Sequence, residues 1–149
     1  MISAGAGRAA ARLAKVLELS LAELEISLPQ YRMLAFLAEG EHGASTLAGN
    51  LDVSRPTVTA LVDGLVSRGW VARAQDERDR RRVTHTLTPA GETALRHADR
   101  QIQQWLDQVL AELEPEQAAS VTAGLRYLGT ALDKARRRRA GAVQQGTTS

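Results

Sequence analysis

The sequence predicts a mainly α-helical fold with a small β-hairpin wing, that is, a winged helix-turn-helix joined to a helical dimerisation region. Three observations predict this fold. A short helix, a tight turn and a well-capped second helix follow one another over residues 45–68. Two short strands, at residues 70–74 and 82–87, flank a charged loop. Long apolar stripes at helical spacing lie on both sides of this central part.

The composition allows one domain of ordinary size or two small lobes that share a core, because the chain has 149 residues, of which 44% are hydrophobic. It contains no apolar run of the roughly 18 residues that a membrane helix needs, and its first residues lack the apolar block of a signal peptide. The absence of cysteine excludes disulfides, thiol redox switching and thiolate metal sites. We therefore expect a cytoplasmic protein that does not contact membranes.

Two helices are predicted before the helix-turn-helix. The first spans about residues 6–25. Its apolar stripe consists of Ala10, Leu13, Leu17, Leu21 and Leu24. Ser27 can cap the second helix, which carries Pro29 in its first turn and extends to about residue 39. Gly40 and Gly43 then interrupt the helical pattern, so we expect a break before the next element.

The helix-turn-helix is predicted from a short helix over residues 45–51 and a longer helix that follows after a brief turn. Ser54 can cap the longer helix, and Pro56 lies in its first turn. Its apolar stripe consists of Val58, Leu61, Val62, Leu65 and Val66. Arg68 and Gly69 end it, since a cation suits the last turn and glycine adopts the left-handed cap.

The longer helix presents small side chains on its outer face. An α-helix fits the major groove of DNA, and its N-terminal residues reach the base edges first. The predicted DNA contacts of this helix and its cap are Ser54, Arg55, Pro56, Thr57, Thr59 and Ala60. Small residues allow a close approach, threonine and alanine methyls can touch thymine methyls, and Arg55 can pair with a guanine or a phosphate. The alternative is a well-capped surface helix without a ligand.

The hairpin between the two predicted strands has a charged tip. Arg78, Arg80 and Arg81 lie there, close in sequence to the predicted reading helix, and arginine is attracted to a narrow, strongly negative minor groove. Asp76 and Asp79 would repel phosphate, so we predict that they shape the wing by pairing with Arg81 or Arg78, which leaves Arg80 as the inserted side chain. The alternative is a solvated loop of mixed charge.

The outer helices predict a partner. A helix capped by Thr88 extends from Pro89 to about residue 113, and a last helix follows the Glu114–Pro115 joint. The last helix has a heptad-like seam of Val121, Leu125, Leu128, Leu132 and Ala135. A monomer could bury these stripes internally, but a homodimer explains them better, because two reading helices about 34 Å apart can bind an inverted repeat in double-stranded DNA.

The predicted organisation has four parts. Residues 1–26 form an N-terminal dimerisation helix, and residues 27–88 form the winged helix-turn-helix DNA-binding domain. Residues 89–139 form C-terminal dimerisation helices. Residues 140–149, AGAVQQGTTS, are small and polar and are predicted to be a disordered tail.

Three segments resemble the MarR family of bacterial winged helix-turn-helix transcription regulators. They read SRPTVTALVDGLVSRGWV at residues 54–71, DERDRRRV at 76–83 and LTPAG at 87–91. The resemblance covers nearly the whole chain, because the flanking helices also fit. It implies a homodimeric DNA-binding regulator that acts as a repressor, in which Arg80 is the wing arginine and a carboxylate–arginine pair shapes the wing. It also implies a small aromatic or anionic effector, bound between the dimer helices and the winged lobe, that weakens DNA binding.

Other function classes fit the sequence less well. No nucleophile triad, phosphate-binding loop or carboxylate pair predicts an enzyme, and no cofactor is predicted. His42, His85 and His97 are isolated, so no metal site is predicted. A winged helix can also serve as a protein-interaction module, and the salt dependence of binding would separate that function from DNA binding. The basic run at residues 134–139 can contact phosphates or can simply suit a helix C-terminus.

Overall fold

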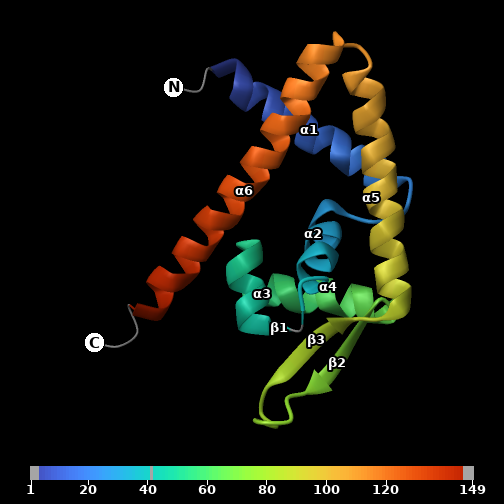
Figure 1. Cartoon of the computed structure of the whole chain (residues 1–149). Coiled ribbons are helices and arrows are strands. Elements are labelled where there is room, and N and C mark those ends of the chain that lie inside the picture. The colour runs from blue at the N-terminus through green and yellow to red at the C-terminus, as the bar shows by residue number, and fades with distance from the viewer. Residues whose placement is uncertain (1–3, 41, 146–149) are drawn as a thin grey trace. The chain divides into compact units, whose positions relative to one another are not determined.

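The computed structural model describes residues 4–40 and 42–145 and has the predicted fold class, mostly helical with a small antiparallel sheet (Figure 1). In chain order the elements are α1 (Ala4–Ala22), α2 (Leu28–Leu37), β1 (His42–Gly43), α3 (Ala44–Leu51), α4 (Arg55–Ser67), β2 (Val71–Gln75), β3 (Val83–Leu87), α5 (Pro89–Leu110) and α6 (Pro115–Gln145). The chain divides into two compact units at residue 105, so the first contains α1 through most of α5 and the second contains α6.

Helix α2 begins as predicted. Ser27 accepts a hydrogen bond at Oγ from the backbone N–H of Gln30 (3.2 Å), and Gln30 Oε1 accepts one from the backbone N–H of Ser27 (3.0 Å). This reciprocal pair satisfies two backbone donors that a helix start leaves without partners. The turn before it contains Glu25 in a left-handed conformation (φ 55°), which reverses the chain between α1 and α2. Local sequence therefore sets where α2 starts.

The sheet has three strands in the order β1–β3–β2, with β3 in the centre. The sequence predicted only the hairpin of β2 and β3, so the two-residue strand β1 is an addition. It pairs His42 with His85, and the His85 ring Nδ1 lies 3.1 Å from the carbonyl oxygen of His42. His85 is 5% exposed and faces the interior. A strand of two residues is too short to produce an alternating pattern, which is why the sequence did not reveal it.

The winged lobe is built around one apolar core. Its members are Met33, Leu34, Phe36, Leu37, Leu47, Leu51, Val58, Val62, Leu65, Val71 and Leu95. Full burial of a leucine or valine side chain stabilises a fold by about 1.5–3 kcal/mol. A second, smaller cluster contains Leu21, Ile26 and Ala98 from α1, the α1–α2 turn and α5. Tyr31 and Trp70 pack against both clusters, so they join the lobe to the helices around it.

Helix α6 has an exposed apolar seam, and it extends beyond its predicted end. Three side chains of its seam are well exposed within the chain: Val121 at 40%, Leu128 at 51% and Leu132 at 61%. The helix continues to Gln145, so the prediction of a disordered tail is wrong for residues 140–145. Alanine and glutamine favour helix, and the single Gly141 costs only about 1 kcal/mol in a helix interior. Residues 146–149 lie outside the described residues.

Over the described part of the chain, no helix is both long enough and apolar enough to cross a membrane.

Candidate nucleic-acid interface

The N-terminus of α4 is fixed by its cap. Ser54 has an extended backbone, and its Oγ accepts a hydrogen bond from the backbone N–H of Thr57 (3.2 Å). The hydroxyls of the same two residues lie 2.8 Å apart. Pro56 suits the first turn because it has no backbone N–H to satisfy there. These local interactions start the helix where the sequence predicted and leave its first turn at the surface.

The inner face of α4 is buried and its outer face is open. Val58, Val62 and Leu65 are each at most 1% exposed and anchor the helix in the lobe core. The sequence-predicted contact residues Ser54, Arg55, Pro56, Thr57, Thr59 and Ala60 are all exposed. The structure therefore gathers these six residues at one accessible helix end.

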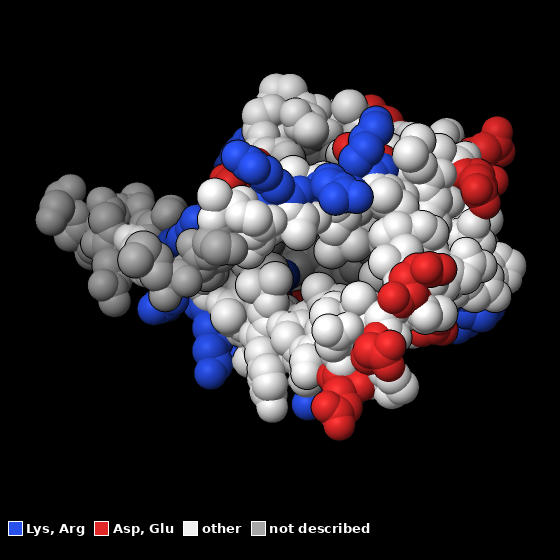
Figure 2. Space-filling model, turned by 90° about the horizontal axis from the view of Figure 1, so that it is seen from above, with Lys and Arg blue, Asp and Glu red and all other residues white. Residues whose placement is uncertain are grey.

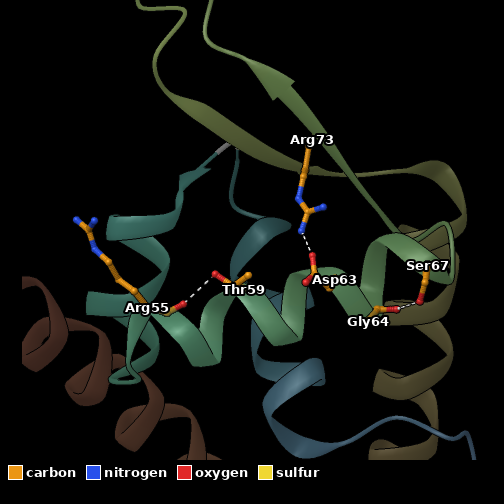
Figure 3. A network of polar contacts seen from close by, with 6 residues as sticks. All are labelled: Arg55, Thr59, Asp63, Gly64, Ser67 and Arg73. Atoms are coloured by element: carbon orange, nitrogen blue, oxygen red, sulfur yellow. Dashed lines mark hydrogen bonds and ion pairs between the residues drawn. The ribbon is translucent and has the colours of Figure 1, made fainter.

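Two hydrogen bonds orient side chains at the N-terminal end of α4. Arg55 Nη2 donates a hydrogen bond to Ser45 Oγ of α3 (2.5 Å), which ties α4 to the preceding helix. Thr59 Oγ1 donates to the carbonyl oxygen of Arg55 one turn earlier (3.1 Å; Figure 3). The Thr59 hydroxyl proton is thus occupied within the helix, while its methyl group and the remaining guanidinium donors of Arg55 stay available to a ligand.

An ion pair joins the outer face of α4 to the wing. Arg73 of β2 points toward Asp63 of α4 and pairs with its carboxylate (Figure 3). The sequence did not reveal this ion pair, because the two residues are ten positions apart on different elements. Both side chains are well exposed, so the pair contributes at most about 1 kcal/mol to stability. It neutralises the one carboxylate that α4 carries on this face.

The tip of the wing is shaped differently from the prediction. Asp76 Oδ1 accepts a hydrogen bond from the backbone N–H of Arg78 (2.8 Å), and Asp79 Oδ1 accepts one from the backbone N–H of Arg81 (3.1 Å). Within the described residues neither carboxylate forms an ion pair with an arginine, so the predicted carboxylate–guanidinium clamp is wrong. Short aspartate side chains instead bond to the backbone two residues ahead, which is a local turn geometry.

This geometry leaves the wing arginines exposed. Arg78, Arg80 and Arg81 are all at the surface, and the loop is closed behind them by a hydrogen bond that the backbone N–H of Asp76 donates to the carbonyl oxygen of Arg82 (2.9 Å). The hairpin of β2 and β3 extends away from the lobe (Figure 1). Since the aspartates bind backbone donors, all three guanidinium groups keep their charge directed toward solvent.

The second unit also separates its charges. Between residues 106 and 125 there are four acidic residues and no basic residue, whereas residues 126–139 contain six basic residues and one acidic residue. Figure 2 shows that Lys, Arg, Asp and Glu side chains all lie at the surface on the face that it presents. Arg136 pairs with Asp133 at 3.6 Å, one turn apart on α6. Because α6 continues to Gln145 and has no basic residue in its last turn, the basic run at residues 134–139 does not lie at the helix C-terminus, and the interpretation that it suits a helix end is wrong.

A hollow of about 460 Å³ lies on the first unit, lined by residues of α2, β3 and α5 and of the segment after α2. Its lining includes Leu37 of α2, Thr86 of β3, and Leu95, Arg96 and Asp99 of α5. Arg96 pairs loosely with Glu92 (3.9 Å). Neither Tyr31 nor Trp105 is part of this lining.

Tyr31 is instead a structural residue that borders the two apolar clusters. Its hydroxyl donates a hydrogen bond to Asp99 Oδ1 (2.9 Å). Burial, followed by the hydrogen bond to the Asp99 carboxylate and that carboxylate's charge, raises the pKa of Tyr31 well above its ordinary value. Among the described residues, no group of three histidine or carboxylate side chains is placed to hold a metal ion.

Known proteins resemble this chain in sequence. The sequence profile of the MarR family matches residues 26–83. The Bacillus subtilis protein YfiV, an uncharacterized HTH-type transcriptional regulator, is 32% identical over 118 residues, which cover 77% of this chain and 72% of YfiV. YpoP from the same organism, also an uncharacterized HTH-type transcriptional regulator, is 35% identical over 74 residues, 49% of this chain and 52% of YpoP.

Solved structures share the fold. Apo wild-type MarR from E. coli superposes with a TM-score of 0.76 at 23% identity and covers 86% of this chain and 97% of its own. RV1404 from Mycobacterium tuberculosis gives a TM-score of 0.74 at 24% identity, with 83% and 86% covered. A mutant of S. aureus MepR bound to an oligodeoxyribonucleotide gives 0.64 at 19% identity, with 89% and 99% covered.

The exposed reading helix, the arginine-tipped wing and the similarity to YfiV over most of both chains lead to one conclusion. This chain belongs to the MarR family of DNA-binding transcription regulators.

Proposed function

We propose that the regulator acts as a homodimer that binds a palindromic operator through α4 and the wing, represses transcription and is released by a small ligand. One observation carries the proposal. The N-terminal end of α4, with its small side chains, is exposed, and so are the three arginines at the tip of the wing, whose aspartates bind backbone N–H groups. A helix end of this kind fits the major groove, and an arginine-tipped hairpin fits the neighbouring minor groove. The cytoplasm, where the chromosome lies, is the corresponding location.

In the proposed complex, α4 reads base edges with its first two turns. Pro56, Thr57 and Ala60 present small apolar groups, which suit thymine methyls. Arg55 is oriented by Ser45, so its remaining donors can pair with a guanine or a phosphate. Ser54 and the first-turn backbone N–H groups lie where a helix start favours phosphate.

The wing supplies the second set of contacts. Arg80 is at the tip and enters the minor groove, while Arg78 and Arg81 flank it and neutralise phosphates. Asp76 and Asp79 hold the tip by bonding to backbone N–H groups, a role that keeps all three cations available. The minor groove of A·T-rich DNA is narrow and strongly negative, and arginine binds best in such a groove. The wing should therefore add a preference for A·T-rich sequence beside the half-site.

The exposed seam of α6 supports the homodimer. Leu128 and Leu132 are more than half exposed within the chain, which would leave apolar area in water unless a second copy covers it. Two-fold symmetry would then place two α4 helices about one DNA turn, roughly 34 Å, apart. A palindromic operator mirrors that symmetry.

The ligand site is proposed at the hollow beside α5. Leu95 offers an apolar wall and Arg96 a cation, and the weak pairing of Arg96 with Glu92 leaves that cation able to meet an anionic group. A small aromatic or anionic effector there would contact α2, β3 and α5 together. It would release DNA if it bound more tightly to a conformation of the protein that cannot bind the operator.

Selection of bound sequences from random duplexes by the purified protein tests the proposal. A palindromic consensus is the expected result, and enrichment of no sequence would contradict it. With that operator, Arg80→Ala should weaken binding by about 1–3 kcal/mol, or roughly 5- to 150-fold, measured by fluorescence anisotropy. Arg100→Ala on α5, also an exposed arginine, is the matched control and should bind as wild type does.

A salt titration of the same complexes separates DNA binding from docking on a protein. Binding through several arginines releases counterions, so affinity should fall steeply as salt rises. Loss of one phosphate contact, for example in Arg78→Ala, should reduce the slope by about one. A salt-independent affinity would favour an apolar protein interface and would exclude groove binding through the wing.

A further inference from the structure

The C-terminal end of α4 is held by one arginine. Arg68 is the residue that follows α4, and its Nη1 donates a hydrogen bond to the carbonyl oxygen of Glu25 (2.5 Å). Glu25 lies in the left-handed turn between α1 and α2. The guanidinium carbon of Arg68 also lies 3.6 Å from the centroid of the Trp70 ring, well within the range of a cation–π interaction. One side chain therefore connects the end of α4 to the end of α1.

Trp70 extends this connection to α5. Its carbonyl oxygen accepts a hydrogen bond from the backbone N–H of Thr88 (3.0 Å), and Thr88 Oγ1 donates to the carbonyl oxygen of Gly69 (2.6 Å). Helix α5 begins directly against this turn, since a Cβ added at Gly91 would lie 2.0 Å from the Trp70 carbonyl oxygen. The end of α4 and the start of α5 lie side by side in Figure 1.

The tryptophan ring adds packing to these polar contacts. Trp70 packs against the lobe core and also against the cluster of Leu21, Ile26 and Ala98. Among the described residues, only the side chains of Trp70 and Tyr31 border both apolar clusters. Moving α4 relative to α1 or α5 would disturb the ring, the guanidinium above it and the hydrogen bond to Glu25 together.

We infer that Arg68 and Trp70 form a positioning pair that fixes the orientation of α4 relative to α1 and α5, and through it the separation of the two α4 helices in the dimer. This inference rests on the dimeric operator binding proposed above. Arg68 lies 13 positions after Arg55, about 20 Å along the helix at 1.5 Å per residue, so it acts on base reading through the position of α4.

Operator spacing provides the test. A series of duplexes carries the two selected half-sites with their separation lengthened or shortened by single base pairs, each step being about 3.4 Å. Wild-type protein should prefer one separation over its neighbours by about tenfold. Arg68→Ala should reduce this preference several-fold, because α4 can then adjust to the altered separation. Arg68→Lys, which keeps a cation and a donor, should restore much of it.

Two further variants separate positioning from folding. Arg32→Ala removes a comparable hydrogen bond, from Nη2 to the carbonyl oxygen of Leu51 (2.9 Å), but one that lies inside the lobe. It should retain the wild-type spacing preference even if it lowers affinity at every separation. Trp70→Leu keeps an apolar side chain but removes the ring beneath the cation, and it should lose the preference as Arg68→Ala does. Thermal melts monitored by circular dichroism verify that each variant is folded.

The outcomes distinguish this inference from the proposed function. Wild-type protein that binds paired half-sites more tightly than a single half-site, with one preferred separation, supports the dimeric operator complex. If folded Arg68→Ala and Trp70→Leu then keep the full preference, the positioning role is wrong and the proposed function stands. If wild-type protein shows no preferred separation, both are wrong.

Discussion

The lobe and helix α6 carry similar apolar stripes but bury them differently. In the lobe, Val62 and Leu65 lie on one face of α4 and are at most 1% exposed. On α6, Leu128 and Leu132 lie on one face as well, yet 51% and 61% of their surfaces remain exposed. The periodicity of apolar residues therefore identifies which face of a helix must be buried. It does not identify whether the same chain or a second molecule buries that face.

Helix α5 shows both behaviours along its own length. Ala98, near the lobe, is fully buried, whereas Val109, farther along the same helix, is 42% exposed. Helix α1 changes in the opposite direction, with exposed residues near its start and Leu21 buried near its end. In both helices the stripe is covered where it adjoins the second apolar cluster and becomes open farther away.

Truncating one leucine from each region should give the largest contrast. Leu65→Ala removes a fully buried side chain, so we expect the free energy of unfolding to fall by about 2–5 kcal/mol. Leu132→Ala should change the stability of a separate subunit by less than about 0.5 kcal/mol. Urea denaturation at several protein concentrations measures both.

The concentration dependence sharpens this comparison. If a second copy covers α6, Leu132→Ala should weaken the dimer and lower the denaturation midpoint most at low protein concentration. Equal losses for Leu65→Ala and Leu132→Ala at every concentration would contradict the division into a self-covered lobe and an open helix.

Two glycines provide an intermediate contrast. Gly91→Ala would place a Cβ 2.0 Å from the Trp70 carbonyl oxygen, so we expect a loss of about 1–3 kcal/mol from overpacking. At Gly124 of α6, an added Cβ would meet no atom of the described residues within 4 Å apart from its chain neighbours and the backbone of its own helix, and alanine favours helix by about 1 kcal/mol. Thermal unfolding should therefore show a lower midpoint for Gly91→Ala and a higher one for Gly124→Ala. A lower midpoint for both would mean that a partner packs tightly against Gly124.

The smallest expected change in stability comes from removing one tyrosine hydroxyl. Tyr31→Phe removes the hydrogen bond to Asp99 and should cost about 0.5–1.5 kcal/mol near neutral pH. Because the pKa of Tyr31 is raised in the folded protein, its contribution is present below pH 10 and is lost as pH rises above that value. Wild-type stability should thus decline at alkaline pH more steeply than that of Tyr31→Phe. Tyr127→Phe on α6, where the side chain is 67% exposed, should leave stability near neutral pH unchanged.

Most of the fold and part of the interface could be predicted from the sequence because they depend on local signals. Ser27 and Ser54 mark helix starts through hydrogen bonds to residues three positions ahead. Thr88 marks the start of α5 in the same way, accepting a hydrogen bond from the Gly91 N–H (3.1 Å). The roles of the wing aspartates were predicted only in outline, since opposite charges close in sequence do not reveal whether a carboxylate will choose a guanidinium or a backbone donor.

The sequence was enough to predict every element except β1 and the last turns of α6, together with the caps, the outward face of α4, the basic wing and the resemblance to the MarR family. Three features became visible only in the tertiary structure. Arg73 pairs with Asp63, and Arg68 donates to the carbonyl oxygen of Glu25, 43 positions away in sequence. The third feature is which part of each apolar stripe is buried. The physical reason is the range of the interactions. Capping and helix periodicity act within a few residues, whereas a long side chain selects its partner only after packing has brought distant segments together.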